Sequence, residues 1–306
     1  LRLLRRAAVR RRRQVRQRHR LAELHPPRRR GGGRGEGRPE LAHAAHRSAL
    51  RALRRPSRPR LPRRPGADGP ALLHERRRAE ARAVRVKGPS LAEVESWVFD
   101  LDNTLYPHTL RLFDQVSARM TTFVMRELGL AHAEADALRA RYWREHGTTL
   151  AGLMEVDGID PEDFLAEVHE IDLSALVPDP RLDAALAALP GRRVVYTNGS
   201  RDHAARITEK LGIRGRFEAL YGVEDAGFVP KPRRAAFERV FAADGLDHAR
   251  AAMVEDDQRN LEVPHALGMA TIWAPLDPDE AAGAHVGHVA VDLAAFLETV
   301  LEPDRA

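Results

Sequence analysis

Along residues 180–306, segments with the apolar pattern of strands alternate with segments that have the apolar spacing of helices. Short runs rich in β-branched and aromatic residues predict strands at 193–197, 219–221, 252–255 and 271–273, and a similar run precedes them at 97–99. Apolar residues at helical spacing predict helices at 181–189, 200–211, 232–243, 261–267 and 292–301. This alternation indicates a parallel sheet with right-handed crossovers and helices on both faces.

Residues 109–179 interrupt this alternation with a block that contains no strand pattern. Helices are predicted at 110–128, 131–145, 150–156 and 161–169, and Gly129 ends the first of them. The block falls between the first and second strands. The sequence therefore predicts an α/β fold with a parallel-sheet core at 91–108 and 180–306 and an all-helical insertion at 109–179.

Charge divides the chain near residue 90. Residues 1–90 hold 29 Lys and Arg against 6 Asp and Glu, whereas the remainder holds 21 against 38. The first segment has no Phe, Trp or Tyr, so we expect this Arg-rich, low-complexity stretch to be disordered. Lys87 is its only lysine, and cations that are almost all Arg suggest a GC-rich coding sequence. We therefore favour the interpretation that this segment is translated upstream DNA, with the true start near Val84 or Val86. A transit peptide and a genuine basic tail are the alternatives.

A basic tail would place the protein in a different class, the nucleic-acid-binding proteins. The lack of aromatic residues for base stacking disfavours nucleic acid as a partner. The chain contains no Cys, which excludes disulfides and thiol catalysis. No apolar run approaches ~18 residues, the length of a membrane span, and no secretory signal precedes the core. We therefore expect a cytoplasmic protein without a membrane partner.

Candidate chemistry begins where the first strand ends. Asp100 and Asp102 follow this strand, and side chains at i and i+2 point the same way while strand geometry persists. Two adjacent carboxylates are costly unless a positive group such as a divalent metal lies beside them. The same Asp-x-Asp-Asn pattern also suits a turn, so this motif alone leaves both interpretations open.

Two further polar clusters suit a phosphate group. Thr197 and Asn198 end the second strand just before a helix, where a hydroxyl and backbone amides can bind phosphate oxygens; capping of that helix is the alternative. Lys231, one of three lysines in the chain, lies between two prolines in front of another helix. A rigidly held ammonium group of this kind could neutralise the negative charge of a phosphoryl group. The alternative interpretation is that Lys231 is a solvated cation in a loop.

An acidic cluster ends the fourth strand. Glu255, Asp256 and Asp257 are followed by Asn260, and hard carboxylate oxygens of this kind favour Mg²⁺. A capped loop is again the alternative interpretation, because Asp257 can begin a helix.

Together the four clusters, in this order, resemble the motifs of the haloacid dehalogenase superfamily over residues 96–273. The resemblance implies a Rossmann-like core with a helical cap domain inserted after the first strand. Within the superfamily, the stretches 99–107, 147–150 and 224–228 are similar to the pyrimidine 5′-nucleotidase branch.

The resemblance also implies a mechanism. Asp100 would be the nucleophile that forms an aspartyl-phosphate, and Asp102 would protonate the leaving oxygen and then deprotonate water. Thr197, Asn198 and Lys231 would bind the transferring phosphoryl group. Mg²⁺ would be held by a carboxylate oxygen of Asp100, the backbone carbonyl of Asp102 and the side chain of Asp256, with water and phosphate as further ligands. Asp257 would orient a metal-bound water or bind the metal directly, with Asn260 behind the ligands.

Specificity is expected from the helical insertion. Tyr106 could stack on a base, and His146, Thr148 and Thr149 could offer hydrogen bonds, although hinge and packing roles are equally open. Three arginines on one predicted helix are expected to form a solvated face; they are Arg139, Arg141 and Arg144.

The resulting prediction is a Mg²⁺-dependent phosphatase that hydrolyses nucleoside 5′-monophosphates, with a small phosphorylated molecule as its partner. A phosphoglycolate or sugar-phosphate phosphatase, or a phosphomutase, remains an alternative in the same superfamily. Dehalogenases of this fold generally lack the second acid, so the presence of Asp102 favours phosphate-ester hydrolysis. A non-catalytic scaffold is disfavoured by the complete set of motif residues. The sequence leaves base preference and oligomeric state open.

Overall fold

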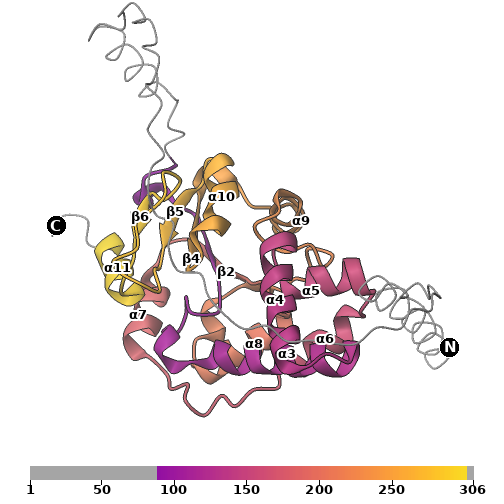
Figure 1. The fold of residues 1–306 in the computed structure, drawn as a ribbon. Coiled ribbons are helices and arrows are strands. Elements are labelled where there is room, and N and C mark those ends of the chain that lie inside the picture. The colour runs from indigo at the N-terminus through magenta and orange to yellow at the C-terminus, as the bar shows by residue number, and fades with distance from the viewer. Residues whose placement is uncertain (1–87, 302–306) are drawn as a thin grey trace, which may run out of the picture. The chain divides into compact units, whose positions relative to one another are not determined.

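Six parallel strands form the central sheet, in the spatial order β3-β2-β1-β4-β5-β6 (Figure 1). This computed structural model describes residues 88–301, which lie within one compact unit, Arg85–Ala306. The strands are β1 (Ser96–Phe99), β2 (Arg192–Tyr196), β3 (Ala219–Tyr221), β4 (Ala251–Glu255), β5 (Ala270–Trp273) and β6 (His288–Val289). The chain moves outward from β1 to β3 and then returns to place β4 on the other side of β1. This reversal of strand order is where ligands bind in open α/β sheets.

The first five strands confirm the predicted ones within a residue or two at each end. The sixth, β6, has no counterpart among the predictions, because it is two exposed residues long and leaves no apolar pattern to detect. All predictions that concern residues 1–87 lie outside the described part of the chain. No helix among residues 88–301 is both long and apolar enough to cross a membrane.

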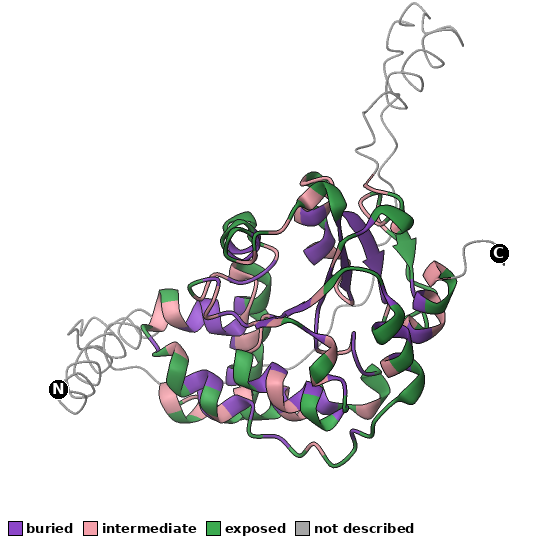
Figure 2. Cartoon of the chain, turned by 180° about the vertical axis from the view of Figure 1, so that it is seen from behind, coloured by how far each residue is buried: buried purple, intermediate pink, exposed green. Residues whose placement is uncertain are grey.

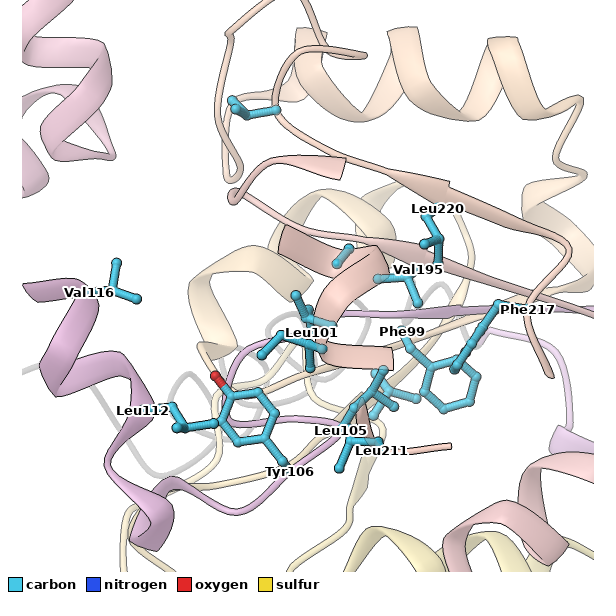
Figure 3. Close-up of a cluster of buried hydrophobic side chains, with 14 of the residues drawn as sticks. Phe99, Leu101, Leu105, Tyr106, Leu112, Val116, Val195, Leu211, Phe217 and Leu220 are labelled. Carbon is cyan, nitrogen blue, oxygen red and sulfur yellow. The ribbon is translucent and has the colours of Figure 1, made fainter. Parts of the chain in front are cut away.

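Alternating strand side chains bury both faces of the sheet. Trp97 and Phe99 of β1 join one buried cluster, whereas Val98 between them joins the other. The first cluster includes Val195 and Phe217 (Figure 3). Figure 2 shows the buried strands between helices whose outer sides are exposed.

Helices of the core cover the two faces. The first face packs against α7 (Pro180–Ala188), α8 (Arg201–Lys210) and α11 (Leu293–Leu301), and the second against α9 (Arg234–Asp244) and α10 (Glu262–Ala266). Single 3₁₀ turns complete the core at Leu91–Glu93, Arg214–Arg216, His248–Arg250 and Gln258–Leu261. Burial of both faces explains why the strands read as continuous apolar runs.

The segment between β1 and β2 contains helices and no strand, as predicted. A 3₁₀ turn at His108–Leu110 leads into α3 (Leu112–Leu128), α4 (His132–His146), α5 (Thr149–Gly152) and α6 (Pro161–Val168), which are grouped on one side in Figure 1. The predicted helix 150–156 is α5 continued by a π-helical turn at Leu153–Asp157. We call residues 112–168 the helical block.

A glycine pair gives a test of the core. Gly191 precedes β2 with φ +78°, and a Cβ there would collide with the Glu95 carbonyl oxygen, whereas Gly245 ends α9 with φ +74° and has nothing within 4 Å of a Cβ position. Gly191→Ala is expected to lower the free energy of unfolding by ~3 kcal/mol, and Gly245→Ala by ~1–2 kcal/mol from backbone strain alone. Urea unfolding followed by circular dichroism measures both. Equal losses would show that the contact with Glu95 has no cost.

Candidate active site

Strand register brings the predicted motifs together at one edge of the sheet. Phe99 pairs with Val195 on one side and with Val254 on the other, so the residues that follow each strand lie next to one another. The backbone N–H of Asp100 donates to the Val254 carbonyl at 2.9 Å. The carboxyl ends of β1, β2 and β4 thus place Asp100, Thr197 and Glu255 around one point.

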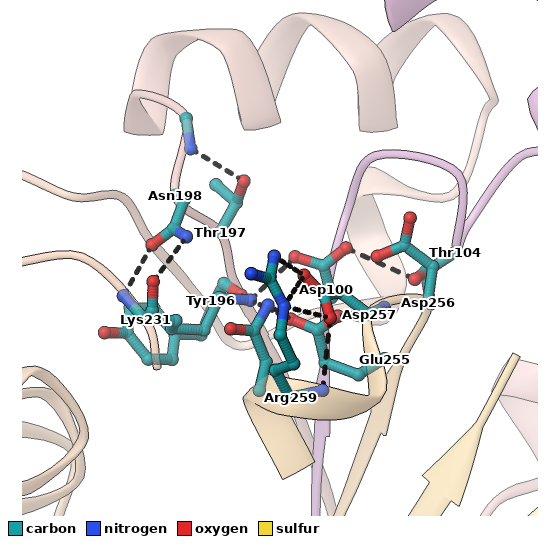
Figure 4. Close-up of polar contacts among 12 residues, drawn as sticks. Asp100, Thr104, Tyr196, Thr197, Asn198, Lys231, Glu255, Asp256, Asp257 and Arg259 are labelled. Atoms are coloured by element: carbon teal, nitrogen blue, oxygen red, sulfur yellow. Dashed lines mark hydrogen bonds and ion pairs between the residues drawn. The ribbon is translucent and has the colours of Figure 1, made fainter. Parts of the chain in front are cut away.

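Lys231 is the buried cation of this site (Figure 4). Its side chain is 1% exposed, and Nζ donates to Oδ1 of Asp100 at 2.7 Å, to Oε1 of Glu255 at 2.6 Å and to the Tyr196 carbonyl at 2.9 Å. Burial alone would lower the pKa of Lys231, but the adjacent carboxylates of Asp100 and Glu255 outweigh it and raise that pKa. The solvated-loop interpretation of Lys231 is therefore wrong.

Asn198 holds the Lys231 loop in place. Its side-chain Nδ2 donates to the Lys231 carbonyl at 3.1 Å, and its Oδ1 accepts the Lys231 N–H at 2.8 Å. The neighbouring Thr197 is 1% exposed, and its Oγ1 accepts the Gly199 N–H at 2.9 Å. Since the Asn198 side chain is engaged with Lys231, its backbone N–H is the group left to face a phosphate, beside the Thr197 hydroxyl.

Three carboxylates surround a common point beside Lys231. Ligand oxygens of Asp100, Glu255 and Asp256 lie within 4.8 Å of one another. Burial, followed by repulsion from a neighbouring carboxylate, raises the pKa of Asp100 and of Asp256 to about 7. Burial also raises the pKa of Glu255 to about 7, against the opposing effect of Lys231. One lysine does not balance three carboxylates, and a hard divalent cation would complete the balance.

The hydrogen bonds indicate which of these oxygens fit a metal. Both oxygens of Glu255 are occupied, Oε1 by Lys231 and by Asn260 at 2.7 Å, and Oε2 by the Asp257 N–H at 3.0 Å. Asp256 accepts a hydrogen bond from Asn103 to Oδ2 at 3.3 Å and interacts with the adjacent carboxyl of Glu255. Each oxygen of Asp100 accepts one hydrogen bond, Oδ1 from Lys231 and Oδ2 from Thr104 at 3.2 Å, so each keeps a second lone pair for a metal. Asp100 and Asp256 therefore fit as direct ligands, while Glu255 holds Lys231 and Asn260. The Asp102 carbonyl accepts no backbone hydrogen bond from residues 88–301, which leaves it suitable as a ligand.

Asp257 lies apart from the three-carboxylate group. Its carboxylate caps the following 3₁₀ turn at the Arg259 N–H and receives the Arg259 guanidinium at 3.0 Å. The guanidinium in turn lies 3.9 Å over the ring of Trp143, which is 47% exposed on α4. Asp257 thus organises a contact between the core and the helical block.

Two side chains that the sequence analysis did not connect with Asp102 contact its carboxylate. The Tyr106 hydroxyl donates to Oδ1 of Asp102 at 2.6 Å, and Nε2 of His203 lies 3.0 Å from the same oxygen. Burial would raise the pKa of Asp102, but the charge and hydrogen bond of His203, together with Tyr106, hold it at about 2. The carboxylate is therefore ionised at neutral pH.

A cavity of about 1190 Å³ extends from these groups to the helical block. The predicted site residues that line it are Asp100, Asp102, Thr148, Thr149, Thr197, Asn198, Lys231, Asp256, Asp257 and Asn260. Tyr106 and His146 are not among its lining residues: Tyr106 is buried with its hydroxyl on Asp102, and His146 lies 2.9 Å from Glu155. This geometry gives no support to base stacking by Tyr106 or to substrate binding by His146.

One face of α4 also lines the cavity. Arg139 and Trp143 lie on it, one helical turn apart. The expected solvated face is wrong for Arg139, whose side chain is 13% exposed and donates to Ser117 at 3.0 Å; Arg141 and Arg144 are exposed as expected. Sequence patterns could not identify Trp143, Arg259 or His203, because nothing local marks which side of a helix meets the site.

The sequence of this chain is similar to that of a known protein family and to a protein from yeast. The sequence profile of the haloacid dehalogenase-like hydrolases matches residues 97–268. Phosphate metabolism protein 8 of Saccharomyces cerevisiae (strain ATCC 204508 / S288c) is 28% identical over 192 residues, which cover 57% of this chain and 59% of the yeast protein. The chain thus matches less than two-thirds of that relative.

Solved structures of similar fold include enzymes with two different chemistries. L-2-haloacid dehalogenase from Xanthobacter autotrophicus is 18% identical with a TM-score of 0.44, and the match covers 70% of this chain and all of that one. A HAD phosphatase from Thermococcus onnurineus is 14% identical with a TM-score of 0.46, over 67% of this chain and 98% of that one. Likenesses at this level do not separate a dehalogenase from a phosphatase.

Proposed function

This chain belongs to the haloacid dehalogenase-like hydrolases, and from that premise we propose that it is a Mg²⁺-dependent phosphatase acting on nucleoside 5′-monophosphates. The observation that carries the proposal is the pair Asp100 and Asp102, which line one cavity with Lys231 and Asp256. A phosphatase needs an acid for the leaving oxygen in addition to its nucleophile. The helical block, within the predicted insertion 109–179, then serves as the cap domain over the core 91–108 and 180–306.

The first half-reaction transfers the phosphoryl group to Asp100. A carboxylate oxygen of Asp100 attacks phosphorus and the bond from phosphorus to the leaving oxygen breaks. Asp102, which is ionised in the substrate-free site, takes up a proton when the phosphate monoester binds and donates that proton to the leaving oxygen. Lys231 and the Thr197 hydroxyl lie where they can bind the phosphoryl oxygens. Lys231 also favours the ionised, nucleophilic form of Asp100.

The second half-reaction releases phosphate. Asp102, now ionised, takes a proton from water, the water oxygen bonds to phosphorus, and the phosphorus–Asp100 bond breaks. Asp102 thereby regains the proton that it donated. Mg²⁺, held by Asp100, Asp256 and the Asp102 carbonyl, would supply positive charge to the phosphoryl oxygens.

The size and lining of the cavity favour a nucleoside as the leaving group. The cavity of about 1190 Å³ is larger than the ~300–1000 Å³ of most ligand pockets. Trp143 lines it with a half-exposed ring, over which the Arg259 guanidinium lies at 3.9 Å. Stacking of a base on an aromatic ring contributes ~1–3 kcal/mol. Trp143 thus takes the stacking role that the sequence suggested for Tyr106.

A substrate panel tests this proposal. UMP, CMP, AMP, ribose 5-phosphate and phosphoglycolate are compared by released phosphate, and kcat/KM is expected to be at least ~10-fold higher for the nucleotides. Trp143→Ala is expected to remove that preference mainly through KM, while Trp143→Phe retains most of it. Equal kcat/KM on sugar phosphates would support the broader phosphatase instead. Transfer of phosphate without its release would support a phosphomutase.

A further inference from the structure

The hydrogen bonds of Asp102 are all concentrated on one of its two oxygens. Tyr106 donates to Oδ1 at 2.6 Å and His203 lies 3.0 Å from it, whereas no group of residues 88–301 hydrogen-bonds Oδ2. We infer that His203 and Tyr106 are positioning residues, which fix Oδ1 so that Oδ2 is the oxygen that carries and accepts the proton. The inference rests on the proposed phosphatase function, in which Asp102 is the acid and base.

Both donors are themselves held rigidly. The His203 side chain is 1% exposed, and its ring stacks on His169 with 4.2 Å between centroids and 13° between planes. Ser200 links the two histidines, because its Oγ accepts the His203 N–H at 3.2 Å and lies 3.1 Å from Nδ1 of His169. His203 therefore has no room to turn away from Asp102.

Tyr106 is fixed by apolar packing. Its ring is 3% exposed and belongs to the buried cluster that contains Leu105 and Leu112 (Figure 3). Only its hydroxyl has a polar partner, and that partner is Asp102. Two immobile donors on one oxygen leave the carboxylate a single orientation.

This orientation has a chemical consequence. A carboxyl oxygen has two lone pairs, and both on Oδ1 are engaged by Tyr106 and His203. When Asp102 takes up a proton, the proton must therefore reside on Oδ2. Without the two donors the carboxylate could rotate and present either oxygen at the wrong angle, and small errors of placement lower rates steeply.

The test compares substrates whose leaving groups differ in their need for an acid. His203→Leu is expected to lower kcat for UMP by ~100-fold or more, with KM changed by less than ~3-fold, because proton transfer is lost and binding is kept. With p-nitrophenyl phosphate, nitrophenolate leaves without a proton. Stopped-flow mixing should therefore still show a rapid burst of nitrophenolate, followed by slow turnover as water attack becomes limiting.

Conservative variants separate positioning from support of the fold. His203→Gln keeps an N–H donor and is expected to recover at least ~10-fold of the lost kcat, and Tyr106→Phe, which removes one hydroxyl, is expected to lose ~10-fold. His265→Leu on α10, outside the cavity lining, is the control for a His-to-Leu change. Thermal unfolding checks each variant, and Tyr106→Phe carries the test if His203→Leu does not fold.

Three results would overturn the inference: unchanged kcat in both His203→Leu and Tyr106→Phe, loss of the nitrophenolate burst in a folded variant, or no advantage of Gln over Leu at position 203. Failure of the proposed function looks different. In that case the wild-type chain itself would release no phosphate from UMP or from p-nitrophenyl phosphate, which would refute both.

Discussion

Replacing Asp100 by Asn is expected to lower phosphate release by at least ~1000-fold, because an amide oxygen cannot act as the nucleophile. The same change relieves repulsion within the group of Asp100, Glu255 and Asp256, and Lys231 keeps its ion pair with Glu255 at 2.6 Å. We therefore expect the variant to remain folded. Steady-state kinetics with UMP and thermal unfolding measure the two effects separately.

The control is the same substitution on the surface of the helical block. Asp114 lies in the first turn of α3, is 60% exposed and pairs with Arg111, so Asp114→Asn should leave turnover unchanged. Rapid quenching of the wild-type enzyme with substrate, followed by mass spectrometry, should find one phosphoryl group on the peptide that contains Asp100. Turnover by Asp100→Asn within tenfold of wild type would exclude Asp100 as the nucleophile.

Removal of divalent metal is also expected to lower activity strongly. EDTA treatment should lower activity by at least ~100-fold and Mg²⁺ should restore it, because the phosphoryl group would otherwise meet several uncompensated carboxylates. At ~100 times its dissociation constant, Mg²⁺ would stabilise the fold by ~2.7 kcal/mol and raise Tm by about 5–10 °C. Full activity in EDTA would contradict the metal site.

The metal effect should depend on pH in a defined direction. The pKa values of Asp100, Glu255 and Asp256 are raised to about 7 in the fold from ordinary values near 4. Between these limits the folded state holds protons that the unfolded state has released, so the metal-free fold loses stability as pH rises from about 4 to 7. Mg²⁺ competes with those protons, and its effect on Tm should therefore grow from pH 5 to pH 8. A constant Mg²⁺ effect over this range would count against binding at these carboxylates.

Two neighbouring aspartates provide a matched comparison for this site. Asp256→Asn removes a carboxylate of the group and should abolish the rise of Tm with Mg²⁺. Asp257→Asn should retain that rise, because the Asp257 carboxylate faces Arg259 rather than the group. Loss of the Mg²⁺ effect in both variants would instead make Asp257 a ligand, as the sequence suggested.

Local sequence patterns determined the order and type of nearly all the core elements. The strands near 97, 194, 253 and 271 were predictable because burial on both faces of a parallel sheet demands continuous apolar runs. The helical block was predictable because periodicity near 3.6 persists over whole helices. The short edge strand β6 was not, since two exposed residues carry no period.

The sequence also placed Asp100, Thr197, Lys231 and Asp256 correctly at strand ends or before a helix. Parallel strands have their carboxyl ends at one edge, so polar residues that follow them converge whatever the details of packing. That general rule requires only that the strands are parallel and adjacent, and the register then sets which residues lie side by side.

Side-chain partnerships were decided only by the tertiary structure. Asp102 and His203 are 101 residues apart, and no local pattern can report a contact that depends on where a crossover helix comes to lie. In the same way, register and loop geometry turned Glu255 toward Lys231 and Asp257 toward Arg259, although all three acidic residues 255–257 are adjacent in the chain. The sequence by itself determined which residues follow the ends of the strands, because the periodicity that marks strands and helices is local. Which oxygen faces which donor is fixed by packing between distant segments, and only the folded chain contains that information.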